Sequence, residues 1–165
     1  MRRGVLYAVA GALALVAAVV YWHWLGSAEE LAPPEELLEQ ALTAADEPTR
    51  SQAAAKLTRH GEHALPQLRE LAAKGPSPKV QAIAIVGLGT SGDYDSMPKL
   101  LDGLLSEDPS IRLASQAAAE RLLGVRFGYR AGDPPEERAE AAKRMRDHWE
   151  RLKNMPGFRE RVERR

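Results

Sequence analysis

Residues 77–89 read SPKVQAIAIVGLG, and residues 108–122 read DPSIRLASQAAAERL. Both segments carry a proline near their start, 31 positions apart, and apolar residues follow at helical spacing. The shorter segments ALPQL at residues 64–68 and SMPKL at residues 96–100 also match each other, with prolines 32 positions apart. A period of this length indicates a protein built from a repeated pair of helices.

The chain beyond residue 31 is expected to consist of short helices. Valine and isoleucine, which β-sheets favour, are scarce there, whereas alanine is abundant. Glycine and proline interrupt the apolar pattern at short intervals and mark the helix ends. The predicted helices span residues 34–45, 48–60, 63–74, 78–90, 95–106, 109–123 and 135–153.

The helix pairs are expected to stack, because a two-helix unit cannot bury its apolar side alone. This predicts an α-solenoid with one continuous core. The small side chains that would let neighbouring helices approach closely are Ala53, Ala54, Ala84, Ala114, Ala117 and Ala118. The leucines expected to fill the layer between helices are Leu57, Leu68, Leu88, Leu100 and Leu104.

These segments, together with SMPKLLDGLL at residues 96–105, resemble HEAT repeats. The resemblance covers about residues 34–123, as three helix pairs of which the first is degenerate. It implies an all-α fold, a short solenoid of HEAT-like pairs, and a function in binding, since the family consists mostly of scaffolds and adaptors. The stretch at residues 124–150 resembles a C-terminal extension of some bacterial HEAT-repeat proteins, in which a Gly-Tyr turn precedes a tryptophan-rich helix. Met145 and His148 stand here where that pattern often carries tryptophan.

A membrane-spanning helix is predicted at the N-terminus. Residues 4–25 contain no Asp, Glu, Lys or Arg, and a helix of this length reaches about 33 Å, enough to cross a bilayer. The aromatic cluster Tyr21, Trp22 and Trp24 would lie at the membrane interface. We therefore expect residues 1–26 to form a short arginine stub and a signal anchor.

Charge predicts how this anchor is oriented. Arg2 and Arg3 precede the apolar span, and an acidic linker at residues 27–33 follows it, so the N-terminus is expected in the cytoplasm and the remaining chain outside. A cleavable signal peptide is the alternative, with the small residues 26–28 placing cleavage before residue 29. Its apolar region would then exceed the usual length of roughly 7 to 15 residues, which favours the single-pass anchor.

Residues 87–92 read GLGTSG and fit the G-x-G-x-x-G motif of dinucleotide-binding sites. Such a site needs a helix that begins at the third glycine within a βαβ unit, but residues 93–95 intervene and no second strand follows. The glycines are instead expected to end a helix and to permit a positive φ in its C-terminal turn.

Composition and spacing argue against catalysis. The chain has no cysteine, which excludes disulfides, thiolate metal ligands and cysteine nucleophiles. His60 and His63 lie in a predicted turn with too few converging donors for zinc. The 23 basic and 23 acidic residues leave no overall basic footprint for nucleic acid. We expect no catalytic residue, cofactor, metal, small-molecule substrate or nucleic acid.

The C-terminal region is expected to close the solenoid. Residues 124–153 would form a Gly-Tyr turn and a capping helix, followed by a basic tail at residues 154–165. The apolar stripe of that helix is predicted to contain Ala139, Ala142, Met145, Trp149 and Leu152, with Phe127 and Tyr129 beneath Trp149. In the alternative interpretation, its basic face and the tail arginines Arg159, Arg161, Arg164 and Arg165 bind an acidic partner or anionic lipid.

The function that fits these observations best is a non-catalytic, membrane-anchored adaptor that binds a protein partner. The side chains predicted to contact that partner are Arg50, Lys79 and Arg112 on the second helices of the pairs, and Arg138 and Arg144 on the basic C-terminal face. The alternative hypothesis is a HEAT-like enzyme or nucleic-acid-binding module, which would require a cleft of buried carboxylates or a continuous basic groove.

Overall fold

The computed structural model describes residues 31–163. The predicted anchor at residues 1–26, most of the acidic linker at residues 27–33, and Arg164 and Arg165 lie outside the described residues. Within residues 31–163, no helix has the length and apolarity needed to cross a membrane.

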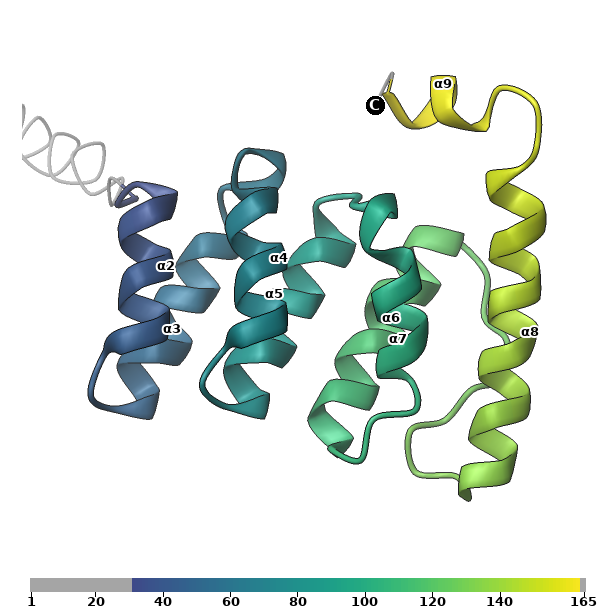
Figure 1. Cartoon of the computed structure of the whole chain (residues 1–165), viewed down its shortest axis with the longest axis horizontal. Coiled ribbons are helices and arrows are strands. Elements are labelled where there is room, and N and C mark those ends of the chain that lie inside the picture. The colour runs from purple at the N-terminus through teal and green to yellow at the C-terminus, as the bar shows by residue number, and fades with distance from the viewer. Residues whose placement is uncertain (1–30, 164–165) are drawn as a thin grey trace, which may run out of the picture. The chain divides into compact units, whose positions relative to one another are not determined.

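The described part of the chain contains helices and no strands, arranged as consecutive antiparallel pairs (Figure 1). The first helices of the pairs form one layer and the second helices form another layer behind it, which confirms the predicted α-solenoid. The pairs are α2 (Pro34–Thr43) with α3 (Glu47–Thr58), α4 (Leu65–Lys74) with α5 (Pro78–Thr90), and α6 (Met97–Gly103) with α7 (Pro109–Leu123). The C-terminal helices are α8 (Pro135–Lys153) and α9 (Phe158–Glu163).

Prolines in the first turn determine where several helices begin. The bounds of α5, α7 and α8 agree with the prediction, and each of these helices starts with proline. The helices predicted at residues 63–74 and 95–106 are shorter than expected. Their first residues belong instead to the 3₁₀ turns η1 (Gly61–Ala64) and η2 (Tyr94–Ser96), and the α-helix begins one residue before Pro66 or Pro98.

Each second helix begins with a side-chain cap, and the three caps are 31 residues apart. Asp46, Ser77 and Asp108 accept hydrogen bonds from backbone N–H groups of the first turn. The shortest of these bonds join Thr49 to Asp46 at 2.8 Å and Ser110 to Asp108 at 2.7 Å. These bonds satisfy donors that have no partner within the helix, and therefore stabilise its start.

Four residues after each cap, a long polar side chain fastens the turn between the two helices of the pair. Arg50, Gln81 and Arg112 each donate a hydrogen bond to the carbonyl oxygen six residues before them, at 2.8, 2.8 and 2.9 Å. These turn-capping residues satisfy carbonyl groups at or near the end of the preceding helix. The 31-residue period of the sequence therefore repeats a set of polar hydrogen bonds at each turn as well as the apolar pattern.

The core contains the five leucines that the sequence placed there, each no more than 2% exposed. Of the alanines expected at helix contacts, Ala53, Ala54, Ala84, Ala114 and Ala118 are buried. Ala117 is exposed, and Ala119 is buried in its place. The prediction for Ala117 was wrong because its position, like residues 55 and 86, points to the outer side of the second helices.

The glycines of the GLGTSG segment have two different roles. Gly92 has a φ of +76° and forms the predicted turn. Gly87 and Gly89 lie inside α5 instead, where neighbouring helices approach closely. A Cβ atom at Gly89 would lie 2.6 Å from the Cα atom of Ala118 in α7, and one at Gly87 would lie 2.7 Å from Cγ2 of Thr58 in α3. The motif therefore serves helix packing, and the βαβ context of a dinucleotide site is absent from residues 31–163.

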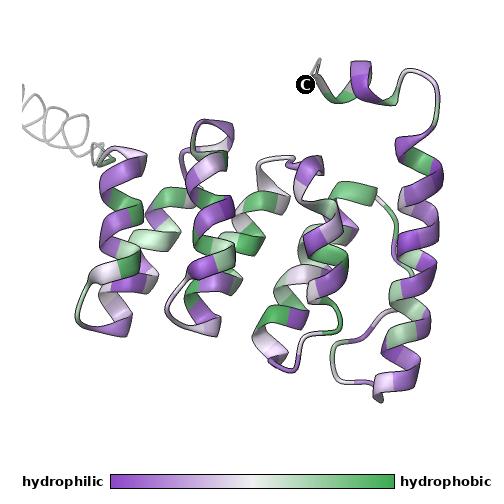
Figure 2. Ribbon diagram, viewed as in Figure 1, coloured by the Kyte–Doolittle hydropathy of each residue, from purple (hydrophilic) through white to green (hydrophobic). Residues whose placement is uncertain are grey.

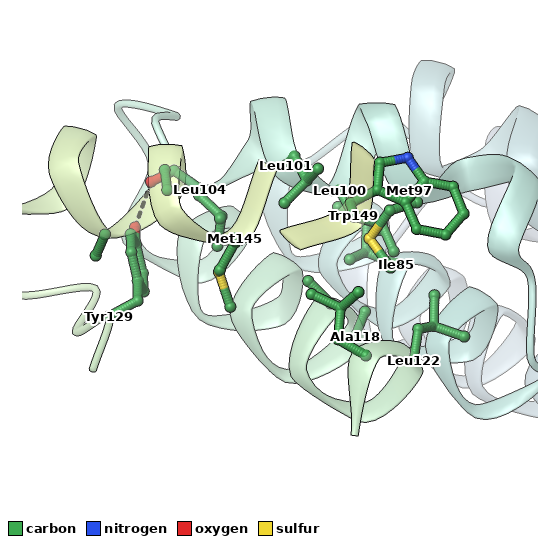
Figure 3. Packing of buried hydrophobic residues seen from close by; sticks show 14 of the residues in the cluster. Ile85, Met97, Leu100, Leu101, Leu104, Ala118, Leu122, Tyr129, Met145 and Trp149 are labelled. Carbon is green, nitrogen blue, oxygen red and sulfur yellow. Dashed lines mark hydrogen bonds between the residues drawn. The ribbon is translucent and has the colours of Figure 1, made fainter. Parts of the chain in front are cut away.

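An extended segment closes the second-helix layer after α7. Gln116 of α7 donates a hydrogen bond of 3.0 Å to the carbonyl of Tyr129, and Nε of Arg112 donates one of 2.9 Å to the carbonyl of Ala131. The hydroxyl of Tyr129 donates to the carbonyl of Leu104 (Figure 3). Position 116 corresponds by the 31-residue period to Ala54 and Ile85, which are buried between helices. Glutamine replaces an apolar residue there because its neighbour is an extended segment whose backbone carbonyl groups need hydrogen-bond donors, rather than another helix.

Helix α8 packs on α6 and brings Met145 and Trp149 into the core beside Leu100 and Leu101 (Figure 3). The stripe differs from the prediction at one position, since Ala139 is exposed and Ala141 is buried.

The aromatic neighbours of Trp149 also differ from those expected. Trp149 is buried, stacks on Tyr94 with ring centroids 6.2 Å apart, and meets Phe158 edge-on at 5.7 Å. Phe127 lies against His148 instead, and Tyr129 reaches Leu104. Residues 158–163, which the sequence analysis assigned to a basic tail, form α9, and Phe158 joins the core.

Candidate binding surface

The second helices α3, α5 and α7 lie side by side and share one outward side (Figure 1). Positions 31 residues apart recur on it, so that Ala55, Val86 and Ala117 are all exposed. We call this surface the second-helix face. It comprises Gln52, Ala55, Arg59, Lys79, Ile83, Val86, Thr90, Ser110, Leu113, Ala117 and Arg121.

The centre of the second-helix face is apolar. Val86 of α5 is 42% exposed and Leu113 of α7 is 57% exposed, with the half-buried Ile83 nearby on α5. Helix α5 carries a single charged residue, Lys79, and is hydrophobic around most of its circumference, whereas hydrophilic residues predominate on α8 (Figure 2). A helix that is apolar on all sides is normally covered on all sides, so this exposed side suits a protein contact.

Basic side chains flank this apolar centre. Arg59 and Arg121 lie at the C-terminal ends of α3 and α7, and Lys79 lies at the start of α5. The second-helix face as defined contains no acidic residue, and the half-buried Glu120 is its neighbour on α7. Glu47, half-buried in the first turn of α3, interacts electrostatically with Lys79, and two further acidic residues occupy the first turn of α2, in the other layer. The surface therefore has an apolar centre with a positive border, which complements an apolar patch bordered by carboxylates.

The five predicted contact residues do not gather on one surface. Arg50 and Arg112 are half-buried turn-capping residues, and Arg50 also pairs with Glu47 at 3.0 Å. Lys79 is exposed on the second-helix face. In α8, Arg138 donates to the carbonyl of Asp133 at 2.7 Å, and Arg144 to the carbonyl of Phe127 at 3.3 Å. Intramolecular bonds thus account for four of the five side chains, and partner binding by any of them stays a prediction.

Sequence reasoning missed Val86 and Leu113 because it searched for charged side chains. The signal was present in the 31-residue alignment, where position 86 corresponds to two alanines on the outer side of their helices. A single exposed apolar residue is ordinary, but apolar residues exposed together on neighbouring helices form the kind of patch that contact surfaces carry.

An ion pair between the half-buried Arg69 of α4 and the buried Asp93 holds the turn after α5 against α4, and so fixes one end of the second-helix face. Arg69 donates to Asp93 through Nε at 2.8 Å, and Ser96 donates to the same carboxylate at 2.5 Å. Burial raises the pKa of Asp93, but the hydrogen bonds from Arg69 and Ser96 lower it by more, so that the pKa lies below its ordinary value. The hydrogen bond to Asp93 raises the pKa of Arg69 in turn. Asp93 therefore remains charged although it is only 3% exposed.

The described residues contain no group of three or more His, Asp or Glu side chains placed to hold a metal ion. His63 is exposed within η1, at the turn that the sequence predicted.

Comparison with known protein families gives a match to HEAT repeats over residues 34–122, which is more than half of the chain. The chain belongs to the HEAT-repeat family. The match covers the three helix pairs, and repeats of this family generally mediate protein–protein interaction. Comparisons with curated proteins and with solved structures gave no significant match.

Proposed function

We propose that this HEAT-repeat chain is a non-catalytic adaptor that binds a protein partner through the second-helix face while residues 4–25 anchor it in a membrane. The observation that carries the proposal is the exposure of Val86 and Leu113 on neighbouring second helices, within a surface that has a basic border. The family supports a protein partner. The anchor rests on the uncharged apolar span of the sequence and the aromatic residues at its end.

Photocrosslinking tests the surface. A benzophenone amino acid at position 86 or 113 should form an adduct with a partner in cells, because both side chains point away from the core. Leu105 provides a matched control, since it is 47% exposed and apolar but lies just after α6, outside the second-helix face. A specific adduct at positions 86 and 113 supports the proposal. Equal adducts at position 105, or adducts there alone, would place the contact elsewhere.

The absence of cysteine from the chain makes the membrane topology directly testable. A single cysteine replacing Ala139, which is exposed on α8 and lies outside the second-helix face, should react with a membrane-impermeant maleimide on intact cells. A cysteine inserted between Met1 and Arg2, which keeps both arginines, should react only after the membrane is opened. Labelling in the opposite order would reverse the proposed orientation, and recovery of the Ala139→Cys protein without the membrane would favour cleavage of the N-terminal segment.

A further inference from the structure

A hollow of about 570 Å³ lies between the start of α6 and the C-terminal helices α8 and α9. Its size is typical of sites that bind small molecules. Residues of η2, α6, α8 and α9 and of the turn between the last two line it, so it is distinct from the second-helix face. The adaptor function proposed above gives this hollow no role.

Three aromatic rings form one wall of the hollow. Tyr94 stacks on Trp149, and Phe158 meets Tyr94 edge-on at 5.4 Å and Trp149 at 5.7 Å. The hydroxyl of Tyr94 donates a 3.0 Å hydrogen bond to the carbonyl of Leu122, which fixes the direction of the ring. Rings held in this way offer a preformed surface for another planar aromatic group, which prefers offset or edge-on contact with them.

The charged side chains around the hollow differ in whether they are already paired. Lys153 pairs with Glu150 at 2.7 Å, and Asp95 on the opposite side pairs with Arg69 at 3.3 Å. Arg159 of α9 is exposed and forms no ion pair with the residues that the structure describes. An arginine guanidinium favours a carboxylate, which it can hold through two parallel hydrogen bonds.

We propose that this hollow binds an aromatic carboxylate, with its ring against the wall formed by Tyr94, Trp149 and Phe158 and its carboxylate on Arg159. The volume admits a molecule of this size, the wall supplies contacts for the ring, and Arg159 selects the negative charge. The carboxylate belongs either to a free aromatic acid or to the C-terminus of a peptide that ends in an aromatic residue.

Trp149 provides the readout. The chain has three tryptophans, so the full-length Trp22→Phe, Trp24→Phe protein retains Trp149 as its only indole. 4-Nitrobenzoate, whose nitroaromatic ring quenches indole emission on contact, serves as the probe. We expect saturable quenching by 4-nitrobenzoate. The neutral 4-nitrobenzamide should bind at least about tenfold more weakly, because it cannot form the charged hydrogen bonds.

Arg159→Gln tests the assignment of the charge. It should weaken binding of 4-nitrobenzoate about tenfold or more and leave binding of the amide unchanged. Arg130→Gln is the matched control, because Arg130 is also exposed but does not line the hollow. Unchanged melting temperatures of both variants would show that folding is retained.

A tetrapeptide ending in 4-nitrophenylalanine, with a free or an amidated C-terminus, distinguishes the two sources. Tighter binding of the free-carboxylate peptide than of 4-nitrobenzoate assigns the hollow to a peptide C-terminus, and weaker binding assigns it to a free acid. Quenching that stays linear in probe concentration, equal affinity for acid and amide, or an unaffected Arg159→Gln protein would overturn the proposal.

Discussion

Replacing Gly89 with alanine should destabilise this protein, although the same change inside most helices stabilises them. Alanine is favoured over glycine by about 1 kcal/mol in a helix interior. At position 89, however, the new Cβ atom would lie 2.6 Å from Cα and 2.7 Å from Cβ of Ala118, where carbon atoms normally stay about 3.5–4.0 Å apart. Because the obstruction includes backbone, α5 and α7 must separate along their contact.

Overpacking a core typically costs about 1–3 kcal/mol, and a backbone contact belongs at the upper end of that range. Subtracting the gain in helix propensity leaves a net loss of about 2 kcal/mol in the free energy of unfolding. For a domain of this size the melting temperature should fall by about 6 °C, which thermal unfolding of the full chain followed by circular dichroism at 222 nm would detect.

Two further variants make the result specific. A Cβ atom added at Gly132 would meet no heavy atom within 4 Å, so Gly132→Ala should change stability by no more than about 1 kcal/mol. Adding Ala118→Gly to Gly89→Ala removes one of the two closest contacts and should recover part of the loss, giving a measurable coupling energy. If Gly89→Ala raises the melting temperature, the close approach of α5 and α7 is refuted.

Predictions at three other sites follow from the same packing and hydrogen bonds, one of them with a matched control. Trp149→Ala should cost about 3–5 kcal/mol in chemical unfolding, and a change below about 0.5 kcal/mol would contradict its role in closing the solenoid. Asp93→Asn should cost about 1.5–3 kcal/mol at pH 7, whereas the exposed Asp95→Asn should cost less than about 1 kcal/mol. Folding lowers the pKa of Asp93. The charged carboxylate therefore stabilises the folded state fully above its unfolded pKa of about 4, and this contribution is lost as the pH falls through the folded pKa. The difference in the free energy of unfolding between wild type and Asp93→Asn should accordingly shrink in acid. Gln116→Ala should lower stability by about 1–3 kcal/mol by leaving a carbonyl of the closing segment without its donor, and an unchanged denaturation midpoint would show that water replaces it.

The sequence predicted those parts of the fold that local rules determine. Helices α5 and α7 were located correctly because a polar cap and a proline begin each of them, and Leu57 and Leu88 were placed in the core by the repeated apolar pattern. The predicted helix starts at residues 63 and 95 were too early, because one turn of 3₁₀ helix is too short for its spacing of apolar residues to be distinguished from that of an α-helix.

Features that depend on a neighbour distant in sequence could not be predicted. The choice between Ala117 and Ala119 depends on how α7 is rotated against α5, and the partners of Trp149 come from η2 and α9 rather than from the adjacent turn. The candidate surface was missed for a different reason, because charged side chains were taken as the contact residues although the alignment already placed Val86 opposite two alanines. Arg50 and Arg112 were predicted to contact a partner, but both donate hydrogen bonds to backbone carbonyl groups of their own turns. Those carbonyl groups come within reach only when the turns fold, so the sequence does not show them.

The turn-capping residues and N-caps have a genetic consequence. A 31-residue block such as residues 75–105 contains the cap Ser77, the turn-capping bond from Gln81 to the carbonyl of Gly75, and its own small-residue contacts, so a tandem duplication of that block inside the gene would produce a complete additional unit. Extension after α7 is different, because a new helix would have to displace the backbone that Gln116 and Arg112 bind. An added unit in the middle of the solenoid is therefore expected to preserve these contacts, whereas one added after α7 would break two of them.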